Sequence, residues 1–347
     1  MRRKPATPRA MDRLLAEQDI LPPGRTTYEL VSEWAAKHVW RVLADGECWA
    51  FIRYLLGPAS EYPDRWRHLR LSEHLYDARV GPRILGVTPE SEALDGRAAI
   101  VEACLRPIER DRLERRNAEA IGLFTRLHGY IPLHTELSRN LTEADRAGVS
   151  TVGEMFAETH ERWFDAVVER WLGFGLGQIN DLAQVVGDLL NELEALEPLT
   201  PKIEIVVPCH NDPNHGNFML NRQGALRLID FETLALNNPV ADIGVYLTWY
   251  VDRDQHVDLL RDYPLADADV MLARMKVWVP LRYLNIAAHW AARLTRADDA
   301  EGWEFAVLSI DEWLTGACEL IYDGYVLDEH RAVLDAVRDS LLERSPE

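Results

Sequence analysis

The chain has 347 residues, of which 47% are hydrophobic and 27% are charged, a balance typical of a folded globular protein rather than a disordered one. Its 38 Lys and Arg residues and 57 Asp and Glu residues give a formal net charge of −19. A surface this negative repels phosphate backbones and anionic lipids, so it argues against nucleic acid and membranes as partners and favours small cationic molecules. At roughly 150 residues per domain, the length indicates two domains or one domain in two lobes.

Neither the N-terminus nor the cysteines indicate export. The first residues are basic, but charged residues interrupt the sequence before an apolar signal segment could form, and no run of about 18 apolar residues occurs that could span a bilayer. The four cysteines, Cys48, Cys104, Cys209 and Cys318, form no CxxC pair and no zinc-binding spacing, so we expect free thiols in a reduced interior. These features predict a cytoplasmic protein.

The N-terminal part of the chain favours β structure. Residues 1–24 contain several prolines and are expected to form a loose lead-in, and the stretch 25–104 that follows is expected to form a small lobe. Asp45-Gly46 separates two β-rich runs and is typical of a tight hairpin turn. A charged stretch with helical spacing occupies residues 64–79. The expected strands cover residues 26–31, 38–42, 48–54, 82–86 and 98–103.

From residue 105 to the C-terminus the pattern is mainly helical. Apolar residues recur at three-, four- and seven-residue steps, which places them on one face of a helix. The expected helices here cover residues 109–128, 152–172 and 181–196, and helices dominate again after residue 242. Short apolar runs at 203–207, 217–220 and 226–229 predict strands among them. We therefore expect an α+β protein with a mostly helical C-terminal lobe over residues 105–347.

One polar segment combines the residue types that phosphoryl transfer needs. Residues 207–220 read VPCHNDPNHGNFML, so an apolar strand leads into a loop that holds Asp212 and Asn217, and a second strand ends at Asp230. This arrangement would bring two carboxylates and a carboxamide oxygen to one edge of a sheet. Transfer from a nucleotide needs one carboxylate to orient the attacking hydroxyl and accept its proton, and hard oxygen ligands to hold Mg²⁺ against the phosphates.

The same segment, His210-x-Asp212-x4-Asn217, with Ile-Asp-Phe-Glu at 229–232 and Asn-Pro-Val-Ala-Asp-Ile-Gly at 238–244, resembles the aminoglycoside phosphotransferase and choline/ethanolamine kinase superfamily. The resemblance covers residues 25 to about 250. It implies a bilobal protein-kinase-like fold that binds ATP between a small β-rich lobe and a larger helical lobe. It also implies that Asp212 is the catalytic base.

Further roles follow from the same resemblance. Asn217 and Asp230 match the magnesium ligands of the family, and Glu232 is expected to help hold a second ion. His210 and Asp242 match positions that brace the catalytic loop by hydrogen bonds. The implied cofactor is therefore Mg²⁺, with ATP or GTP as the co-substrate.

In the small lobe, the resemblance implies that Arg53 binds the α- and β-phosphates and that Glu73, on the following helix, keeps it extended. A guanidinium and a carboxylate suit this task because they pair in a fixed plane. Residues 100–104 lie where the hinge of the family offers backbone hydrogen bonds to adenine, and they include Glu102 and Cys104.

The turn between the first two strands departs from the pattern of the family. Relatives usually carry glycine there, whereas residues 32–38 read SEWAAKH. Either Lys37 or Ser32 contacts phosphate, or the nucleotide is held mainly by Arg53 and the metal ion. A non-catalytic pseudokinase that binds a ligand or partner is an alternative that this turn favours, although the intact Asp212, Asn217 and Asp230 argue against it.

The expected acceptor is a small, cationic molecule with a hydroxyl group, because aromatic rings and carboxylates together attract cations. The C-terminal region is rich in both: Trp249, Trp278, Trp290, Trp303, Trp313, Asp252, Asp254, Asp258, Asp311 and Glu312. The long helical segment between Ile131 and Thr200 favours an aminoglycoside-like or other antibiotic, and an amino alcohol such as choline or ethanolamine is the alternative. A protein kinase is disfavoured because Glu232 stands where that class has glycine. The sequence does not determine the oligomeric state, and a homodimer is one of the alternatives.

Overall fold

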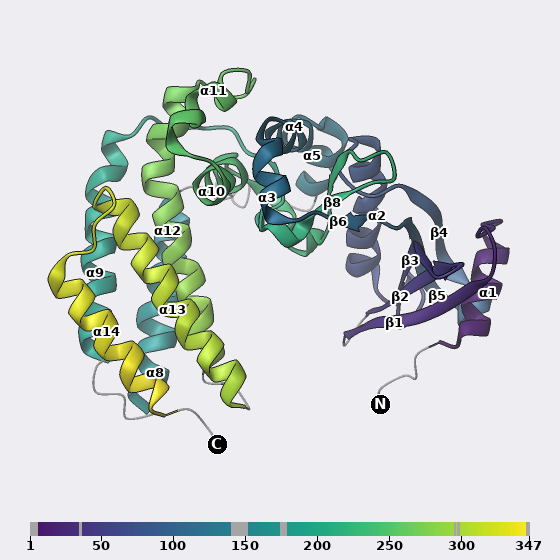
Figure 1. Cartoon of the computed structure of the whole chain (residues 1–347), viewed down its shortest axis with the longest axis horizontal. Coiled ribbons are helices and arrows are strands. Elements are labelled where there is room, and N and C mark those ends of the chain that lie inside the picture. Colours follow the sequence, from purple (N-terminus) through teal and green to yellow (C-terminus); the bar gives the residue numbers. More distant parts are fainter. Residues whose placement is uncertain are drawn as a thin grey trace. The chain divides into compact units, whose positions relative to one another are not determined.

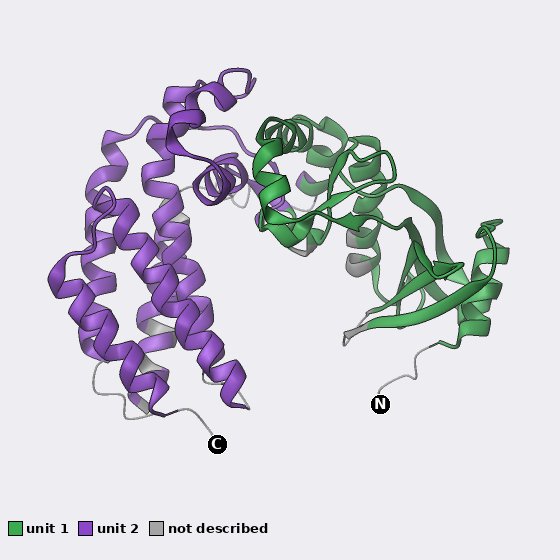
Figure 2. Cartoon of the chain, in the orientation of Figure 1, with its two compact units in different colours: residues 1–137, 212–234 green, residues 138–211, 235–347 purple. Residues whose placement is uncertain are grey.

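The computed structural model describes residues 6–34, 37–139, 152–173, 179–294, 296 and 299–344 (Figure 1). The chain divides into two compact units, each built from two separate stretches of sequence (Figure 2). Unit 1 comprises residues 1–137 and 212–234, and unit 2 comprises residues 138–211 and 235–347. Each unit is described by itself.

Unit 1 contains an antiparallel sheet of five strands in the order β1-β2-β3-β5-β4. Its strands are β1 (Thr26–Trp34), β2 (Lys37–Ala44), β3 (Glu47–Leu55), β4 (Ile84–Ser91) and β5 (Arg97–Ala103). The predicted hairpin turn joins β2 to β3, where Asp45 and Gly46 have φ angles of 51° and 85°. Two successive positive φ angles match the twist of the flanking strands, which explains the Asp-Gly pair.

Residues 8–17 form helix α1 (Pro8–Glu17) and are not part of a loose lead-in, so that expectation is wrong. Proline is acceptable in the first turn of a helix because its missing N–H has no helical partner there, and the Thr7 side chain caps the end by accepting from the N–H of Ala10 at 3.3 Å. Met11 and Leu14 are fully buried against one face of the five-stranded sheet. The helix is therefore an integral layer of unit 1.

Cys48 and Cys104 form a disulfide, with their Cα atoms 5.8 Å apart, so the expectation of free thiols is wrong for this pair. The pairing of Ala50 on β3 with Ala103 on β5 brings the two cysteines together although they lie 56 positions apart in sequence. Cys209 and Cys318 are buried and free. Burial raises the pKa of the Cys318 thiol to about 11, so this cysteine is protonated and unreactive at neutral pH.

The rest of unit 1 packs helices against a small sheet of order β6-β8-β9. These elements are α2 (Pro63–Asp77), β6 (Arg106–Pro107), α3 (Arg110–Leu113), α4 (Asn117–His128), α5 (Ile131–Ser138), β8 (Phe218–Leu220) and β9 (Leu226–Leu228). The N–H of Leu228 donates to the carbonyl of Val80 at 2.8 Å, and Phe124 of α4 packs edge-on against Phe218 of β8. The predicted strands at 217–220 and 226–229 thus form a hairpin fixed to α4 and to the segment after α2.

Unit 2 is mostly helical, with one short antiparallel pair formed by β7 (Val207–Cys209) and β10 (Ala235–Asn237). Its helices are α7 (Val152–His160), α8 (Glu169–Gly173), α9 (Ile179–Leu196), α10 (Val240–Tyr250), α11 (His256–Leu260), α12 (Ala268–Leu294), α13 (Ala300–Ile321) and α14 (Asp328–Leu342), and the segment Glu161–Val168 is a π-helix. Figure 1 shows α12, α13 and α14 side by side. Buried Trp163 and Trp171 donate to carbonyls of α12, those of Leu284 and Ala291, at 2.8 and 3.2 Å.

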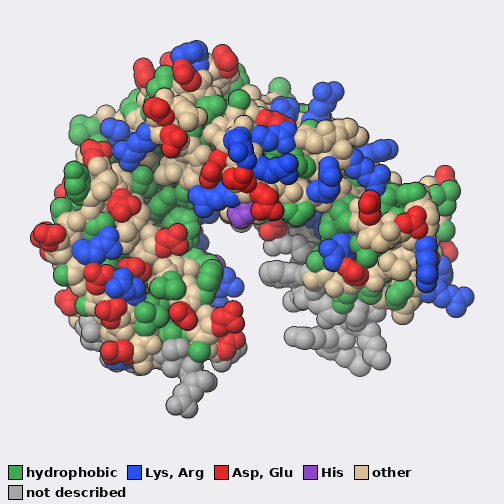
Figure 3. All heavy atoms as spheres, viewed as in Figure 1, with side chains coloured by type: hydrophobic (Ala, Val, Ile, Leu, Met, Phe, Trp, Pro, Cys, Tyr) green, Lys and Arg blue, Asp and Glu red, His purple; other side chains and the backbone are tan. Residues whose placement is uncertain are grey.

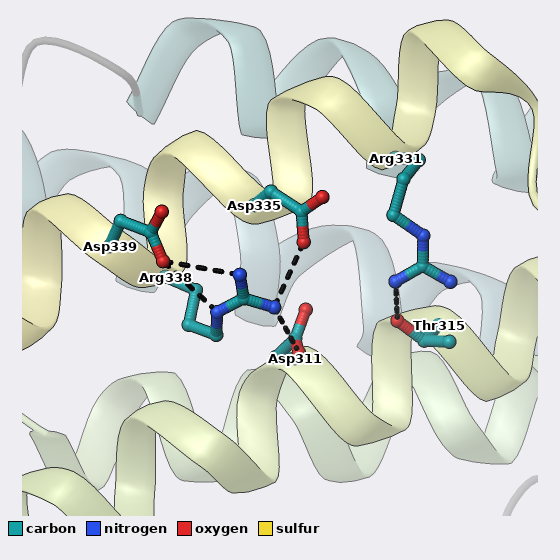
Figure 4. A network of polar contacts seen from close by, with 6 residues as sticks. All are labelled: Asp311, Thr315, Arg331, Asp335, Arg338 and Asp339. Atoms are coloured by element: carbon teal, nitrogen blue, oxygen red, sulfur yellow. Dashed lines mark hydrogen bonds and ion pairs between the residues drawn. The ribbon is translucent and has the colours of Figure 1, made fainter.

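A polar network joins α13 to α14 (Figure 4). Arg338 lies 3.3 Å from Asp311 across the two helices, and 2.9 and 3.1 Å from Asp335 and Asp339 on its own helix. Asp311 is one of the acids considered for a cationic acceptor. Its carboxylate is instead paired with Arg338.

The acidic side chains of unit 2 are scattered over the face drawn in Figure 3 rather than gathered in one patch. Among the described helices, none has both the length and the hydrophobicity that a bilayer span requires. The elements agree with the expected α+β class.

Candidate active site

The loop of residues 210–217, which carries the candidate base, begins directly after β7, and a buried carboxylate holds its first backbone N–H groups. Asp242, in the first turn of α10, is fully buried and accepts hydrogen bonds from the N–H groups of His210 at 2.8 Å and Asn211 at 2.7 Å. Asn211 has a φ of 64°, a left-handed conformation that asparagine tolerates better than most residues. The hydrogen bond from the N–H of His210 to Asp242 is the kind of contact expected of two residues that brace this loop.

In unit 1, two asparagine side chains donate hydrogen bonds to the carboxylate of Asp212. Its Oδ2 accepts from Nδ2 of Asn214 at 2.8 Å and from Nδ2 of Asn217 at 2.9 Å, and the Asn217 amide also lies 2.9 Å from the Asp212 carbonyl. Because the amide nitrogen of Asn217 faces Asp212, its carbonyl oxygen is left for another partner. A carboxamide oxygen is a suitable ligand for Mg²⁺.

Asp230 is brought next to Asn217 by the backbone. The N–H of Ile229 donates to the backbone carbonyl of Asn217 at 3.0 Å, which fixes the residue after β9 against the loop 210–217. Asp230 itself is exposed and has a φ of 59°. Non-glycine residues in this region cost on the order of 1–3 kcal/mol and cluster at functional sites. Asn211 and Asp230 are both non-glycine residues in this left-handed region.

Asn217 and Asp230 open into a cavity of about 550 Å³ that lies wholly within unit 1. Side chains of β2 and β3 form one wall, and the segment that follows β5 forms another. The lining residues are Val39, Arg41, Cys48, Phe51, Arg53, Pro82, Glu102, Ala103, Cys104, Leu105, Arg106, Pro107, Asn217, Met219, Ile229 and Asp230. The apolar side chains suit a flat base, Arg53 suits phosphates, and the side-chain oxygens of Asn217 and Asp230 suit a metal ion.

Arg53 does not pair with Glu73, so that expectation is wrong. Its Nη2 forms an ion pair with Glu102 on the neighbouring strand and donates to the Ser72 hydroxyl at 3.1 Å, whereas Glu73 pairs with Arg70 one turn away on α2. Glu102 is only 5% exposed, and the buried Nε of Arg53 has no hydrogen-bond partner among the described residues. The guanidinium is therefore held by Glu102 on β5 and by Ser72 on α2.

Replacing Glu102 with glutamine is expected to raise the KM for ATP about tenfold, because the loss of one charge-assisted hydrogen bond frees Arg53 to reorient. The matched Glu73→Gln variant removes only an exposed ion pair and should leave this KM within about twofold of wild type. Steady-state kinetics with a fixed acceptor measure both. An equal effect of the two substitutions would contradict the geometry.

The remaining predicted site residues are Cys104, Lys37 and Glu232. Cys104 lines the cavity, but its N–H donates to the carbonyl of Trp49 at 2.9 Å and its sulfur is in the disulfide, so neither group offers adenine a hydrogen bond. The side chains of Lys37 and Glu232 lie outside the described part of the chain. Sequence reasoning missed Asn214, although the loop VPCHNDPNHGN displays it two positions after Asp212.

The tryptophans considered for a cationic acceptor are largely used in packing. Trp249 donates to the Tyr283 hydroxyl at 2.7 Å, and Trp313 packs against both rings, with centroid distances of 5.5 and 4.8 Å. Trp303 donates to the carbonyl of Leu341 at 2.7 Å. The face of Trp290 carries the guanidinium of Arg293 at 4.9 Å. These rings stabilise the helices of unit 2.

A sequence profile of the phosphotransferase enzyme family matches residues 27–278, which is most of the chain and includes the whole candidate site. The chain belongs to this family. The family confirms the predicted class of enzyme, an ATP-dependent phosphotransferase that acts on a small molecule. Family membership also confirms the resemblance that the motif at 210–217 implied.

Solved structures share the fold at low sequence identity. Spectinomycin phosphotransferase in complex with ADP and spectinomycin is 11% identical, with a TM-score of 0.54 over 85% of this chain and 92% of that chain. Plasmodium vivax ethanolamine kinase is 14% identical, with a TM-score of 0.54 over 89% and 84%. The GDP complex of an aminoglycoside 2′-phosphotransferase mutant is 15% identical, with a TM-score of 0.56 over 87% and 95%. These likenesses confirm the predicted kinase-like fold.

A curated relative matches over a short stretch only. An uncharacterized protein of Metamycoplasma hominis is 31% identical over 83 residues, which are 24% of this chain and 16% of that protein. The match therefore covers a small part of its length.

Proposed function

We propose that this enzyme transfers the γ-phosphate of ATP or GTP to a hydroxyl group of a small molecule, with Asp212 as the base. The observation that carries the proposal is the joint position of Asp212, Asn217 and Asp230. The side-chain NH₂ of Asn217 donates to Asp212, and the backbone carbonyl of Asn217 accepts from the N–H of Ile229, the residue before Asp230. The proposal is supported by the cavity at Asn217 and Asp230, which Arg53 also lines. A bound Mg²⁺ would neutralise developing charge on the phosphates.

Each side chain has a separate task in this reaction. Asp212 accepts the proton of the attacking hydroxyl as the new P–O bond forms and the bond to the leaving diphosphate breaks. Asn217 and Asp230 would hold the ion, and Arg53 would bind the phosphates. Asp242 keeps the backbone at Asn211, and hence the start of the loop, in place.

For the acceptor, we propose a hydroxylated antibiotic. The likeness in fold to spectinomycin phosphotransferase and to an aminoglycoside 2′-phosphotransferase supports this choice. An amino alcohol is the second candidate, supported by the likeness to an ethanolamine kinase. Both candidates share the reaction at the hydroxyl.

The test is a screen of nucleotide consumption in which Mg·ATP and Mg·GTP are each supplied with spectinomycin, aminoglycosides, nucleoside antibiotics, choline and ethanolamine. We expect diphosphate formation that depends on one acceptor class, a phosphorylated product in the mass spectrum, and loss of turnover when EDTA removes the metal. Tight nucleotide binding without turnover for any acceptor would contradict the proposal and favour a pseudokinase.

A further inference from the structure

Two asparagine amides converge on one oxygen of the candidate base. Nδ2 of Asn214 donates to Oδ2 of Asp212 at 2.8 Å, and Nδ2 of Asn217 donates to the same atom at 2.9 Å. An ionised carboxylate only accepts hydrogen bonds, so the NH₂ end of each asparagine is the end that faces it. The side chain of Asn214 forms no other hydrogen bond among the described residues.

The other carboxylate oxygen of Asp212, Oδ1, accepts no hydrogen bond from any residue that the structure describes. A carboxylate oxygen has two lone pairs, so the two amides occupy those of Oδ2. Asp212 is half-buried, and Oδ1 is not one of the buried polar atoms that lack a partner. This oxygen is therefore open to an incoming hydroxyl group.

The backbone around Asn214 is held in a short turn. Buried Pro213 restricts the chain between Asp212 and Asn214, because its ring fixes φ. The N–H of Asn217 donates to the carbonyl of Asn214 at 3.0 Å and closes the 3₁₀ turn His215–Asn217. Both amides therefore come from one short segment of fixed backbone.

Gly216 leaves room for the side chain of Asn214. A Cβ atom at position 216 would lie 3.1 Å from Oδ1 of Asn214, which is closer than most contacts of a Cβ atom. Because Oδ1 and Nδ2 belong to the same planar amide, displacing this oxygen would also move the nitrogen that binds Asp212. The glycine thus allows the amide to keep the orientation that the hydrogen bond needs.

We propose that Asn214 is a positioning residue that fixes the carboxylate of Asp212 so that Oδ1 meets the acceptor hydroxyl. This inference rests on the proposed function, because it names the reacting atom of the base. The hydroxyl O–H bond breaks and its proton bonds to Oδ1. The hydroxyl oxygen forms the bond to the γ-phosphorus, and the bond to the diphosphate breaks with its electron pair. Asn214 acts on this reaction through Oδ2 alone.

The hydrogen bonds to Oδ2 persist through the proton transfer. When Oδ1 takes up the proton, Oδ2 becomes the carbonyl oxygen of a carboxylic acid and still accepts from both amides. An amide NH₂ group is a donor only, so neither asparagine competes for the proton. The carboxylate is therefore held in one plane in both charge states, as a base in a fixed attack geometry requires.

The first experiment needs no acceptor. Crystal structures of the full chain with Mg·ADP, as wild type and as Asn214→Ala, show the plane of the Asp212 carboxylate directly. We expect a single orientation in the wild type, with Oδ2 about 3 Å from both amides. In Asn214→Ala we expect the carboxylate to be rotated by more than about 30° or to occupy two orientations. The same single orientation in both proteins overturns the inference.

The second experiment measures the effect on turnover with an acceptor found in the screen. Asn214→Ala should lower kcat about tenfold and leave the KM of each substrate within about twofold, because one charge-assisted hydrogen bond that orients the base is lost. Asn214→Asp keeps the size of the side chain but has no donor, so it should lose at least as much. The exposed Asn180 on α9, replaced by alanine, is the control and should keep the kcat of wild type.

A double-mutant cycle shows whether Asn214 acts through the base. In the background of Asp212→Ala, the further change Asn214→Ala should alter kcat by less than about twofold. A wild-type kcat in Asn214→Ala or in Asn214→Asp, or the full loss repeated in the Asp212→Ala background, overturns the inference and leaves the phosphotransferase intact. If no compound of the screen supports turnover, the proposed function is contradicted, and the crystal structures still test the orientation of the carboxylate.

Discussion

Replacing Asp212 with alanine is expected to lower kcat for phosphate transfer by about 10²- to 10⁴-fold, the usual cost of removing a general base. The carboxylate accepts the proton of the hydroxyl in the transition state, and no amide of its neighbours, Asn214 and Asn217, can take over that task. The effect should appear in kcat, because a proton in transit interacts with the base in the transition state more than in the ground state.

Two controls make this expectation specific. The affinity of Asp212→Ala for Mg·ATP, measured by calorimetry, should stay within a few-fold of wild type, because Asp212 does not line the cavity proposed to bind the nucleotide. The exposed acid Asp254, replaced by alanine, should leave kcat unchanged. Full activity in Asp212→Ala would show that another group is the base.

The candidate site was largely predictable because its residues are close in sequence. Asp212 and Asn217 are five positions apart, and a hairpin of short strands carries the chain back to Asp230. Local backbone geometry therefore brings these three residues close together. The left-handed conformations of Asn211 and Asp230 fit the same logic, since asparagine and aspartate are the non-glycine residues that most readily adopt them.

The contacts of Arg53 could not be predicted in the same way. Glu73 lies on the next helix and is an obvious partner by analogy, but it meets Arg70 three positions away on its own helix. Glu102 lies 49 positions from Arg53 and becomes a neighbour only through the register of β3 and β5, which pairs Arg53 with Ile100. No local pattern fixes that register. The Cys48–Cys104 disulfide depends on the same pairing of strands.

Helix α1 was missed for the opposite reason: a local sequence signal, the prolines near the N-terminus, was given too much weight. Prolines at positions 5 and 8 read as breakers, yet Pro8 occupies the first turn of the helix, where proline is favoured. The apolar residues Met11, Leu14 and Leu15 have helical spacing and are buried against the sheet. The spacing of these three residues was the more reliable guide.

Asp242 is the residue whose replacement should test how the loop is held. In Asp242→Asn, one oxygen acceptor becomes an NH₂ donor, which then faces the N–H of either His210 or Asn211. A buried donor left without an acceptor costs about 1–3 kcal/mol, and loss of the charge weakens the remaining bond, so urea denaturation should show the free energy of unfolding reduced by about 3 kcal/mol.

Activity should fall further than stability alone explains. Under conditions where Asp242→Asn is fully folded by circular dichroism, kcat should still be reduced by about 10²-fold, because Asn211 leaves its left-handed conformation and Asp212 is displaced with it. The KM for ATP should change little, because the cavity with Arg53 and Glu102 belongs to unit 1 and Asp242 belongs to unit 2. The exposed acid Asp252 on the loop after α10, replaced by asparagine, is the matched control. A folded Asp242→Asn enzyme with wild-type kcat would mean that the loop keeps its catalytic shape without this carboxylate.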